Sequence, residues 1–328
     1  MKYDIIFFPT EPESRIESKV ICNLNNSIGT HFPKLKTSIA HHNSFRGLFK
    51  IINTKNVVVH SPLIRSFLVI LLSRLLQKRL LVLIWDIYPI KINARRYDKR
   101  MKRRFYDILE NLSLRFCHHH IIPTEDFKRV KQVRNTTTIS FWPKLLSRFD
   151  SKDILLADNQ DGELKILFAG QINATRGLEE ALKRLDDITP TGFKLLIASS
   201  SPVPRKLKTD PRVHCLGFLK PYELKKLLVG CDFGLISLAK GFDGPAFPSK
   251  SFEYLAAGLP CIYHGPRLED FIYIIEHSGV GIDMKKVEKL TVDQSENMRN
   301  NFSDKLRCFE RLACLQTHDV QMLVKLMR

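Results

Sequence analysis

The chain has 328 residues, of which 44% are hydrophobic and 26% charged, a balance typical of a globular protein with room for two domains. Its seven cysteines form no C-x-x-C pair, which argues against a zinc ribbon or a disulfide framework and favours a reducing compartment. The net charge of +18 is uneven, because residues 1–150 hold 27 Lys and Arg against 11 Asp and Glu, whereas residues 151–328 hold 25 against 23. The basic first half is therefore expected to face an anionic surface, whether membrane lipid, nucleic acid or a phosphorylated acceptor.

Short apolar runs of strand length alternate with stretches of helical length along the first half. This alternation predicts a parallel sheet covered by helices on both faces. The apolar patch at residues 5–8 is short and is flanked by acids at Asp4, Glu11 and Glu13, so it is expected to be a buried strand and not a signal peptide. The predicted strands of this half are residues 3–8, 35–40, 56–60, 80–85, 119–123 and 136–140.

Residues 62–85 are strongly apolar and therefore need a membrane test. The longest run without a charge, residues 66–73, is far shorter than the roughly 18–20 residues of a bilayer span. We expect a helix over about residues 62–77, followed by a buried strand. A partly exposed apolar helix face that dips into a membrane surface stays open as an alternative.

A basic run follows, since seven of the ten residues 95–104 are Lys or Arg. The helical pattern beyond it carries Phe105, Ile108, Leu112 and Phe116 on its apolar side. A charge run is ordinarily a solvated face, but this one adjoins an apolar segment in a basic domain, which favours an anionic membrane or a lipid pyrophosphate. Nucleic acid is disfavoured, because the sequence has no helix-turn-helix, zinc-finger or RNP-like pattern and no stacking aromatics within the run.

The second half repeats the strand and helix alternation. Its predicted strands are residues 164–169, 193–198, 212–216, 233–237 and 261–264. Residues 149–162 are acidic with little periodicity, so we place the boundary there, between domains of residues 1–150 and 151–328, and the last helix can cross back to the first domain. Two such α/β halves leave a cleft between the carboxyl ends of two sheets, the usual ligand site of these folds.

Residues 243–262 (DGPAFPSKSFEYLAAGLPCI) are the stretch that we take as the centre of the second half. Its start signal at Pro248 and Ser249 and its stop after residue 257 predict a short helix over about residues 249–257. Lys250 and Glu253 then lie on one face near the positive end of the helix. There a lysine and backbone N–H groups can hold a diphosphate, and a carboxylate can accept hydrogen bonds from ribose hydroxyls. The alternative is an ordinary capped helix with a solvated Lys and Glu.

Residues 166–185 (ILFAGQINATRGLEEALKRL) predict a strand, a turn at Gly170 and a helix that opens near Gly177. The turn lacks the G-x-G-x-x-G pattern of a dinucleotide site. Its amides and Arg176 can nevertheless meet an anion at the helix N-terminus. Together with Lys250 they supply two cations for one diphosphate, as nucleotide-sugar chemistry needs when no metal neutralises the leaving group.

Three segments carry a family resemblance in their order and spacing: AGQINATRGL, CLGFLKPYELKKLLVGCDFGLISL and FPSKSFEYLAAGLPCI. They resemble the donor half of retaining glycosyltransferases of family 4, above all bacterial members that act in O-antigen, capsule or exopolysaccharide assembly. The resemblance covers residues 160–285 well. In the first half it is fainter and limited to residues 57–62, 85–89 and 121–130.

This resemblance implies an α/β protein of the GT-B fold, with two Rossmann-like parallel-sheet domains facing each other across a cleft. Residues 1–150 would bind the acceptor and face the membrane, and residues 151–328 would bind the donor. The implied activity is that of a hexosyltransferase or related glycosyltransferase, which moves a sugar from a nucleotide-diphosphate sugar to a lipid-linked saccharide with retention and without metal or cofactor. The implied location is cytoplasmic and peripheral, against the anionic inner face of the cell membrane, with no nucleic-acid partner.

The resemblance also implies a set of donor-binding residues. Arg176 would lie on the donor diphosphate with Lys250 close to it, and Glu253 would hold the ribose. Gly217 and Phe218 would lie beside the base. The remaining members of the implied donor set are Gly170, Gln171, Gly177, Asp243 and Ser249.

The chain departs from the family pattern at two positions. Gln171 stands where many relatives have Arg, and Pro245 stands where many have a second glutamate that touches the donor sugar. Asp243 could replace that acid only if the loop differs. These departures keep open the alternative of a catalytically inactive glycosyltransferase-like binding or partner subunit.

Two residues of the first half follow apolar strands and are catalytic candidates. By resemblance His60 could stabilise the transferring sugar or the acceptor, and its alternative is a histidine satisfied by local hydrogen bonds. Asp86 could act as a base or orienting group for the acceptor hydroxyl, or could simply form a turn before Pro89. The adjacent histidines at residues 118–120 are not expected to bind metal, because neighbouring strand residues point to opposite faces.

Overall fold

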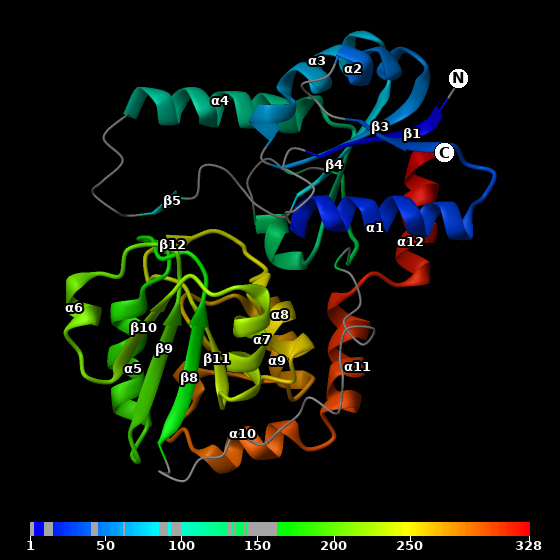
Figure 1. The fold of residues 1–328 in the computed structure, drawn as a ribbon. Coiled ribbons are helices and arrows are strands. Elements are labelled where there is room, and N and C mark those ends of the chain that lie inside the picture. Colours follow the sequence, from blue (N-terminus) through cyan, green and yellow to red (C-terminus); the bar gives the residue numbers. More distant parts are fainter. Residues whose placement is uncertain are drawn as a thin grey trace.

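The structure is a computed structural model, and it describes residues 3–9, 16–40, 45–61, 63–84, 91–92, 100–129, 133, 135–140, 142 and 163–328. Two α/β units lie one above the other in Figure 1, each built around a six-stranded parallel sheet. The fold class predicted from the sequence is thereby confirmed. The predicted boundary at residues 149–162 lies outside the described residues.

The first sheet has the strand order β2-β1-β3-β4-β6-β7, and its neighbouring strands are all parallel. Each predicted strand is present, with ends shifted by up to two residues. Their alternating side chains feed two cores, since Ile5 and Phe7 join one buried cluster and Ile6 and Phe8 join another. The strands are β1 (Tyr3–Phe8), β2 (Thr37–Ile39), β3 (Thr54–His60), β4 (Arg79–Leu83), β6 (His119–Ile122) and β7 (Thr136–Thr138).

Helices cover both faces of this sheet. One face carries α2 (Phe45–Ile52), α3 (Phe67–Leu75) and α4 (Arg100–Phe116), and a short 3-10 helix η1 (Leu63–Ser66) precedes α3. The other face carries α1 (Ile16–His31) and the C-terminal helix α12 (Thr317–Met327), which contact each other. In the described part of the chain, no helix is long and apolar enough to cross a membrane.

The predicted apolar side of helix α4 is exposed over its first part. Phe105 and Ile108 are 57% and 63% exposed, whereas the buried positions of the helix are Glu110, Ser113 and Leu114. Figure 1 shows the reason, because α4 extends well beyond the sheet and only its C-terminal half can pack on the strands.

The second sheet has the order β10-β9-β8-β11-β13-β14, also parallel throughout. Counted from its own first strand this is the order 3-2-1-4-5-6, that of the dinucleotide-binding Rossmann fold. The strands are β8 (Leu164–Ala169), β9 (Phe193–Ala198), β10 (Val213–Gly217), β11 (Phe233–Ser237), β13 (Cys261–His264) and β14 (Gly281–Asp283). Only β14 of these was not predicted.

Helices again lie on both faces of the second sheet. Helix α5 packs in one buried cluster, and α8, α9 and α11 contribute to the cluster on the other face. The helices are α5 (Leu178–Ile188), α6 (Arg205–Lys208), α7 (Pro221–Val229), α8 (Lys250–Ala256), α9 (Glu269–His277), α10 (Val292–Arg299) and α11 (Phe302–Ala313), with a 3-10 helix η5 (Met284–Lys286) after β14.

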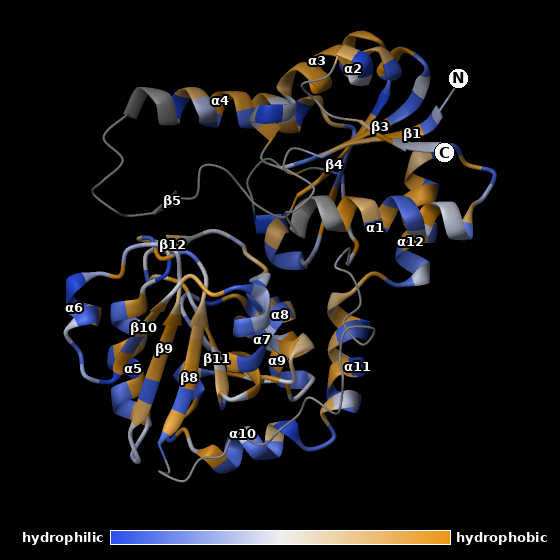
Figure 2. Cartoon of the chain, in the orientation of Figure 1, coloured by the Kyte–Doolittle hydropathy of each residue, from blue (hydrophilic) through white to orange (hydrophobic). Residues whose placement is uncertain are grey.

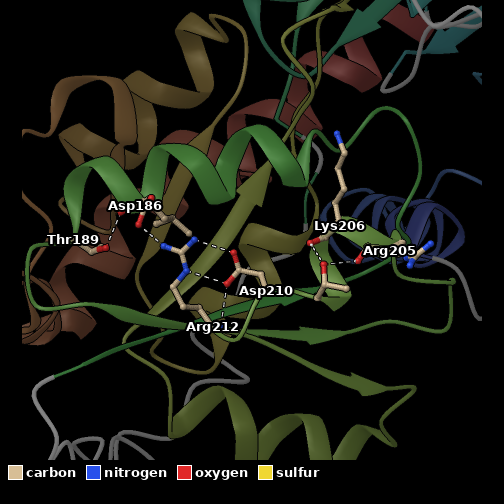
Figure 3. Close-up of polar contacts among 8 residues, drawn as sticks. Asp186, Thr189, Arg205, Lys206, Asp210 and Arg212 are labelled. Atoms are coloured by element: carbon tan, nitrogen blue, oxygen red, sulfur yellow. Dashed lines mark hydrogen bonds and ion pairs between the residues drawn. The ribbon is translucent and has the colours of Figure 1, made fainter.

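An arginine network fixes the edge strand β10 (Figure 3). The Arg212 guanidinium donates to both carboxylate oxygens of Asp210, at 3.0 and 2.9 Å, and also pairs with Asp186 on α5. The same guanidinium lies over the Phe193 ring, 5.0 Å from its centroid. The residue before β10 is therefore held to α5.

The two units meet through residues that follow strands of both sheets. After β6, the 3-10 helix η2 (Glu125–Arg129) contacts the N-terminus of α9, where the N–H groups of Asp126 and Asp270 each donate to the carboxylate of the other, at 2.8 and 3.0 Å. Arg129 pairs with Glu269 at 2.7 Å. Because β6 and β13 both end just before these residues, the carboxyl edges of the two sheets face each other.

A small antiparallel ladder makes a second connection. Strand β5 (Lys91–Ile92) belongs to the first half of the chain, and β12 (Phe242–Asp243) follows β11 of the second sheet. Phe242 pairs with Ile92 and Asp243 with Lys91. The segment before α8 is thereby tied to chain from the first half (Figure 1).

Candidate functional site

The topological switch point of the second sheet lies between β8 and β11. At this point the strand order reverses, so the connections after β8 and β11 leave on opposite faces of the sheet and leave a crevice between them, where ligands of such sheets bind. The turn with Gly170 and Arg176 follows β8, and the segment that leads to Lys250 follows β11. The turn with Gly170 and Arg176 and the segment with Lys250 therefore flank the position that the topology alone would select.

A tight contact places the turn after β8 against the end of β11. Gly177 has φ +56° and begins α5, and a Cβ atom there would lie 2.6 Å from the Cα of Ala239. The Ala239 N–H donates to the carbonyl of Thr175 at 2.7 Å, and the Ser237 hydroxyl donates to the carbonyl of Arg176. Glycine is required here because its neighbour is backbone, which cannot move aside. Arg176 is thereby held at the switch point, partly exposed.

Helix α8 is anchored beside the same point by Tyr254. The tyrosine is buried, and its hydroxyl oxygen accepts the N–H of Ala169 at 2.9 Å, at the last residue of β8. Its ring lies against Gly234 of β11, where a Cβ atom would come within 2.3 Å of the ring. Burial raises the pKa of Tyr254, so the hydroxyl stays protonated. This anchor points the adjacent Glu253 away from the core.

Lys250 and Glu253 form an ion pair on the exposed side of α8. Their side chains are 39% and 46% exposed, so solvent and ligands can reach both. A Cβ atom built at Gly170 would lie 3.9 Å from Cε of Lys250, which places the lysine beside the turn after β8. The two predicted halves of the diphosphate site, the glycine turn and the α8 lysine, are thus adjacent in space.

The predicted base site lies farther along the same sheet edge. Gly217 ends β10 with φ +71°, and its carbonyl accepts the N–H of Ser199 at 2.8 Å. Phe218 follows and is 74% exposed. Strand β9 separates β10 from β8, so Gly217 and Gly170 are about 10 Å apart across the sheet, a span that suits a nucleoside diphosphate.

Three further members of the predicted set lie around this arrangement. Gln171 is exposed next to Gly170. Ser249 precedes α8 and makes no side-chain cap, although its carbonyl accepts the N–H of Phe252 at 3.2 Å. Asp243 lies in β12, and Pro245 follows it on the way to α8.

In the first unit, His60 ends β3, next to β1, where the order of the first sheet reverses. Its ring is fully buried, and Nδ1 lies 2.8 Å from the carbonyl oxygen of Ser61, so Nδ1 carries the proton and donates it. The following turn is fixed by Glu110 of α4, whose two carboxylate oxygens lie 2.9 and 3.2 Å from the Leu63 N–H. Asp86 lies outside the described residues.

The structure adds positioning residues that the sequence pattern did not single out. Tyr254 packs its ring against Gly234, which lies 20 residues earlier in the chain, and accepts the N–H of Ala169. Only this contact in the structure shows that the two residues position α8. Glu110 lies within an amphipathic pattern as an apparently ordinary surface acid, yet it is 3% exposed. A charged residue inside a buried helix position is the signal that could have found it.

Metal ligands form no cluster in the part of the chain that the structure describes. There, no group of three or more His, Cys, Asp or Glu side chains is placed to hold an ion. Among the described residues, Arg176 in the turn after β8 and Lys250 beside Gly170 bring positive charge to the switch point of the second sheet.

Comparison with solved structures identifies the class of fold. The chain is similar to the lipopolysaccharide outer core galactosyltransferase WaaB, with TM-score 0.53, 12% identity, and coverage of 93% of this chain and 99% of that one. It is also similar to WaaG, a glycosyltransferase involved in lipopolysaccharide biosynthesis, with TM-score 0.57, 11% identity, and coverage of 97% and 99%. A third similar structure, described as trehalose-6-phosphate from E. coli bound with UDP-2-fluoro glucose, has TM-score 0.60, 9% identity, and coverage of 99% of both chains.

The chain therefore has the two-domain GT-B fold along nearly its whole length. No family model matches the sequence, and no curated protein matches it either. Identities of 9–12% establish the fold alone.

Proposed function

We propose that this protein is a glycosyltransferase that moves a sugar from a nucleotide-diphosphate sugar to a saccharide acceptor. The observation that carries the proposal is the meeting of the Gly170 turn with the Lys250–Glu253 pair at the switch point of the second sheet. WaaB and WaaG, which share the fold, are described as glycosyltransferases, and a third similar structure is described with a UDP sugar bound. These descriptions support the proposal.

In the proposed complex the donor lies along the carboxyl edge of the second sheet. Gly217 and Phe218 would flank the base, Glu253 would accept hydrogen bonds from the ribose, and Arg176 and Lys250 would hold the diphosphate. Donor binding would exchange the Lys250–Glu253 ion pair for contacts to the nucleotide, since both side chains are already exposed. Asp243 would take the place of the glutamate that many relatives of the resembled family have where this chain has Pro245. Asp243 lies in β12, which pairs with β5.

In the proposed transfer step, the acceptor hydroxyl oxygen bonds to the anomeric carbon as the bond from that carbon to the diphosphate oxygen breaks. The nucleoside diphosphate leaves with the electron pair, and Arg176 and Lys250 stabilise its growing charge without a metal. Asp86 would accept the proton of the acceptor hydroxyl, or would orient that hydroxyl while its proton passes to the departing diphosphate oxygen. Attack from the face that the diphosphate leaves would retain the anomeric configuration. His60, with its fixed Nδ1–H tautomer, would help to shape the acceptor side.

The proposed acceptor is a lipid-linked saccharide of surface-polysaccharide assembly, such as O-antigen or capsule. The uneven charge supports this, because the first 150 residues hold most of the positive excess. The protein would work as a peripheral protein at the cytoplasmic face of the cell membrane, with its basic first domain against anionic lipid.

Release of nucleoside diphosphate from a panel of nucleotide sugars, with purified protein and lipid-linked acceptors, tests the proposal. The wild type is expected to turn over one donor class, and the Arg176→Ala and Lys250→Ala variants are each expected to lose roughly 100-fold or more in rate. Full turnover in either variant would overturn the diphosphate assignment. Nucleotide binding without turnover would instead favour the inactive binding subunit, for which the residues at 171 and 245 argue.

A further inference from the structure

Three neighbouring helices of the first domain expose large apolar side chains. Helix α2 contacts α3, and α3 contacts α4. Of the 13 large hydrophobic residues exposed in the described part of the chain, eight lie on these helices or at the end of α3. Figure 2 shows hydrophobic positions recurring along them. We call this set the outer face, and its members are Phe45, Phe49, Ile52, Leu68, Leu75, Leu76, Phe105 and Ile108.

The same helices also bury apolar side chains on their inner side. Ile51 of α2, Val69 and Ile70 of α3, and Leu114 of α4 belong to the core against the first sheet. A helix that only covers a sheet needs one apolar side. The exposure of Phe45 at 82% and of Leu75 at 72% is therefore unexplained by folding, and large exposed apolar patches mark interaction surfaces.

The charge of this region restricts its partner. Residues 45–84, which include α2 and α3, contain seven Lys and Arg and no Asp or Glu. Arg46 on α2, Arg65 on η1 and Arg74 on α3 are exposed. On α2 and α3 every charged residue is a cation, whereas Asp107 lies next to Ile108 on α4. Exposed apolar groups among cations, as on α2 and α3, match a surface that offers both hydrocarbon and negative charge.

We propose that the outer face docks on an anionic lipid bilayer, with α2 and α3 lying in the plane of the interface. This deepens the proposed function, on which its biological meaning rests, because it names the surface that would bring the protein to a lipid-linked acceptor. A second copy of the chain fits poorly, since a symmetric dimer through α2 and α3 would set like charges against each other, because the charged residues of both helices are all cationic. Nucleic acid fits poorly because Leu and Ile side chains offer no stacking surface.

The proposed docking also sets an orientation. Figure 1 shows α2 and α3 on the side of the first domain that is away from the second domain. With the outer face on the bilayer, the donor domain lies toward the aqueous side. A nucleotide sugar then reaches the second sheet without crossing the lipid interface.

Vesicle flotation with the full chain tests the docking without any turnover. The vesicles are phosphatidylcholine alone or mixed with phosphatidylglycerol. The variants are Phe45→Ser/Phe49→Ser on α2 and, as a matched control, Tyr273→Ser/Met322→Ser, which removes two exposed apolar side chains outside the outer face. Unfolding temperature and mass in solution are measured for each, to verify folding and oligomeric state.

Wild type and control are expected to float with the anionic vesicles, and added salt is expected to weaken this binding. The α2 variant is expected to bind at least roughly tenfold more weakly while remaining folded. Equal binding of the α2 variant, no binding of the wild type to any vesicle, or a wild-type dimer that the α2 variant dissociates would each overturn the proposal. Nucleotide binding by the same proteins is measured separately, so a failed donor site would be distinguished from a failed docking surface.

Discussion

Gly177 positions the turn after β8 at the proposed donor site. Its left-handed φ of +56° starts α5, and its missing side chain lets the loop after β11 approach to backbone contact. Arg176 gains its position from this contact. A sequence shows that a glycine follows an arginine, but it does not show which distant backbone fills the space beside it.

Replacement of Gly177 by alanine is expected to lower the free energy of unfolding by about 3 kcal/mol, from left-handed strain and from the collision with Ala239. Gly217→Ala is the matched control, because φ is +71° there but no atom lies within 4 Å of the new Cβ. That change is expected to cost about 1 kcal/mol. Urea unfolding measures both, and equal losses would contradict the close-contact explanation.

A second prediction at the residue scale concerns the stability of a Tyr254 variant. Tyr254→Phe keeps the ring against Gly234 but leaves the buried N–H of Ala169 without its acceptor. We expect a loss of about 1–3 kcal/mol in the free energy of unfolding. Tyr222→Phe serves as the control, since Tyr222 is 67% exposed, and it should change stability by less than about 0.5 kcal/mol. A Tyr254→Phe protein as stable as the wild type would show that α8 needs no such anchor.

Among the elements, long strands were easier to predict from the sequence than short ones. Five predicted strands match the observed bounds to the residue, because continuous apolar runs bounded by turns leave few alternatives. They are residues 3–8, 164–169, 193–198, 233–237 and 261–264. Length alone does not explain why β14 was missed, because β2 and β7 also have three residues and were predicted. The two-residue strands β5 and β12 form only through pairing with each other from distant parts of the chain. Short elements of this kind depend on tertiary contacts and carry no periodicity of their own.

The candidate site was predictable in part for a related reason. The helix at residues 249–257 and the turn at Gly170 are local features, and the structure brings them together. The inner and outer sides of α4 were not predictable. Phe105 and Ile108 share the helical spacing of Leu112 and Phe116, but the helix extends beyond the sheet, so the first two are exposed.

The contact between η2 and α9 predicts a pH dependence. Burial, more than any other cause, raises the pKa of Asp126, so its ionised form costs stability in the folded state. That cost is present above the raised folded pKa and disappears as pH falls toward the ordinary aspartate value of about 3.9. Asp126→Asn should therefore gain stability relative to wild type at neutral pH, and the gain should shrink as pH falls.

Urea unfolding from neutral pH down to about 4 measures this difference. Asp304→Asn, at an exposed aspartate, is the control and should give a difference that does not follow this trend. A gain for Asp126→Asn that grows on acidification would contradict the assigned sign.

Helix α12 joins the end of the chain to the first domain. Val320, Leu323 and Val324 are buried against that domain, whereas Met322 of the same helix is 37% exposed. We expect Leu323→Ala to lower the free energy of unfolding by about 2–5 kcal/mol and Met322→Ala to change it by less than about 0.5 kcal/mol. If the two variants unfold alike in urea, α12 does not pack as described.

At the scale of the whole molecule, the fold is shared with proteins whose sequences differ from this one at most positions. Identities are only 9–12% over more than nine tenths of the chain, yet the fold is shared, with TM-scores of 0.53–0.60. Hydrophobic pattern and right-handed crossovers restrict the topology far more than residue identity does.

The asymmetry of charge and hydropathy is also a property of the whole chain. The outer face of the first domain is cationic and apolar, whereas the second half of the chain is nearly neutral. The first domain would then determine where the protein works, and the second would determine which donor it takes.

The central claim is that the Gly170 turn and the Lys250–Glu253 pair form a nucleoside diphosphate site. Thermal unfolding with UDP-, GDP-, dTDP- and CMP-linked nucleotides tests it most directly, for wild type, Lys250→Ala, Glu253→Ala and the control Lys206→Ala, whose side chain is exposed on α6. We predict that one nucleotide class stabilises wild type and control, by about 2.7 kcal/mol at about 100 times Kd, and that both site variants lose the effect. Stabilisation of Lys250→Ala and Glu253→Ala equal to that of the wild type, or no stabilisation of the folded wild type by any nucleotide, would contradict the claim.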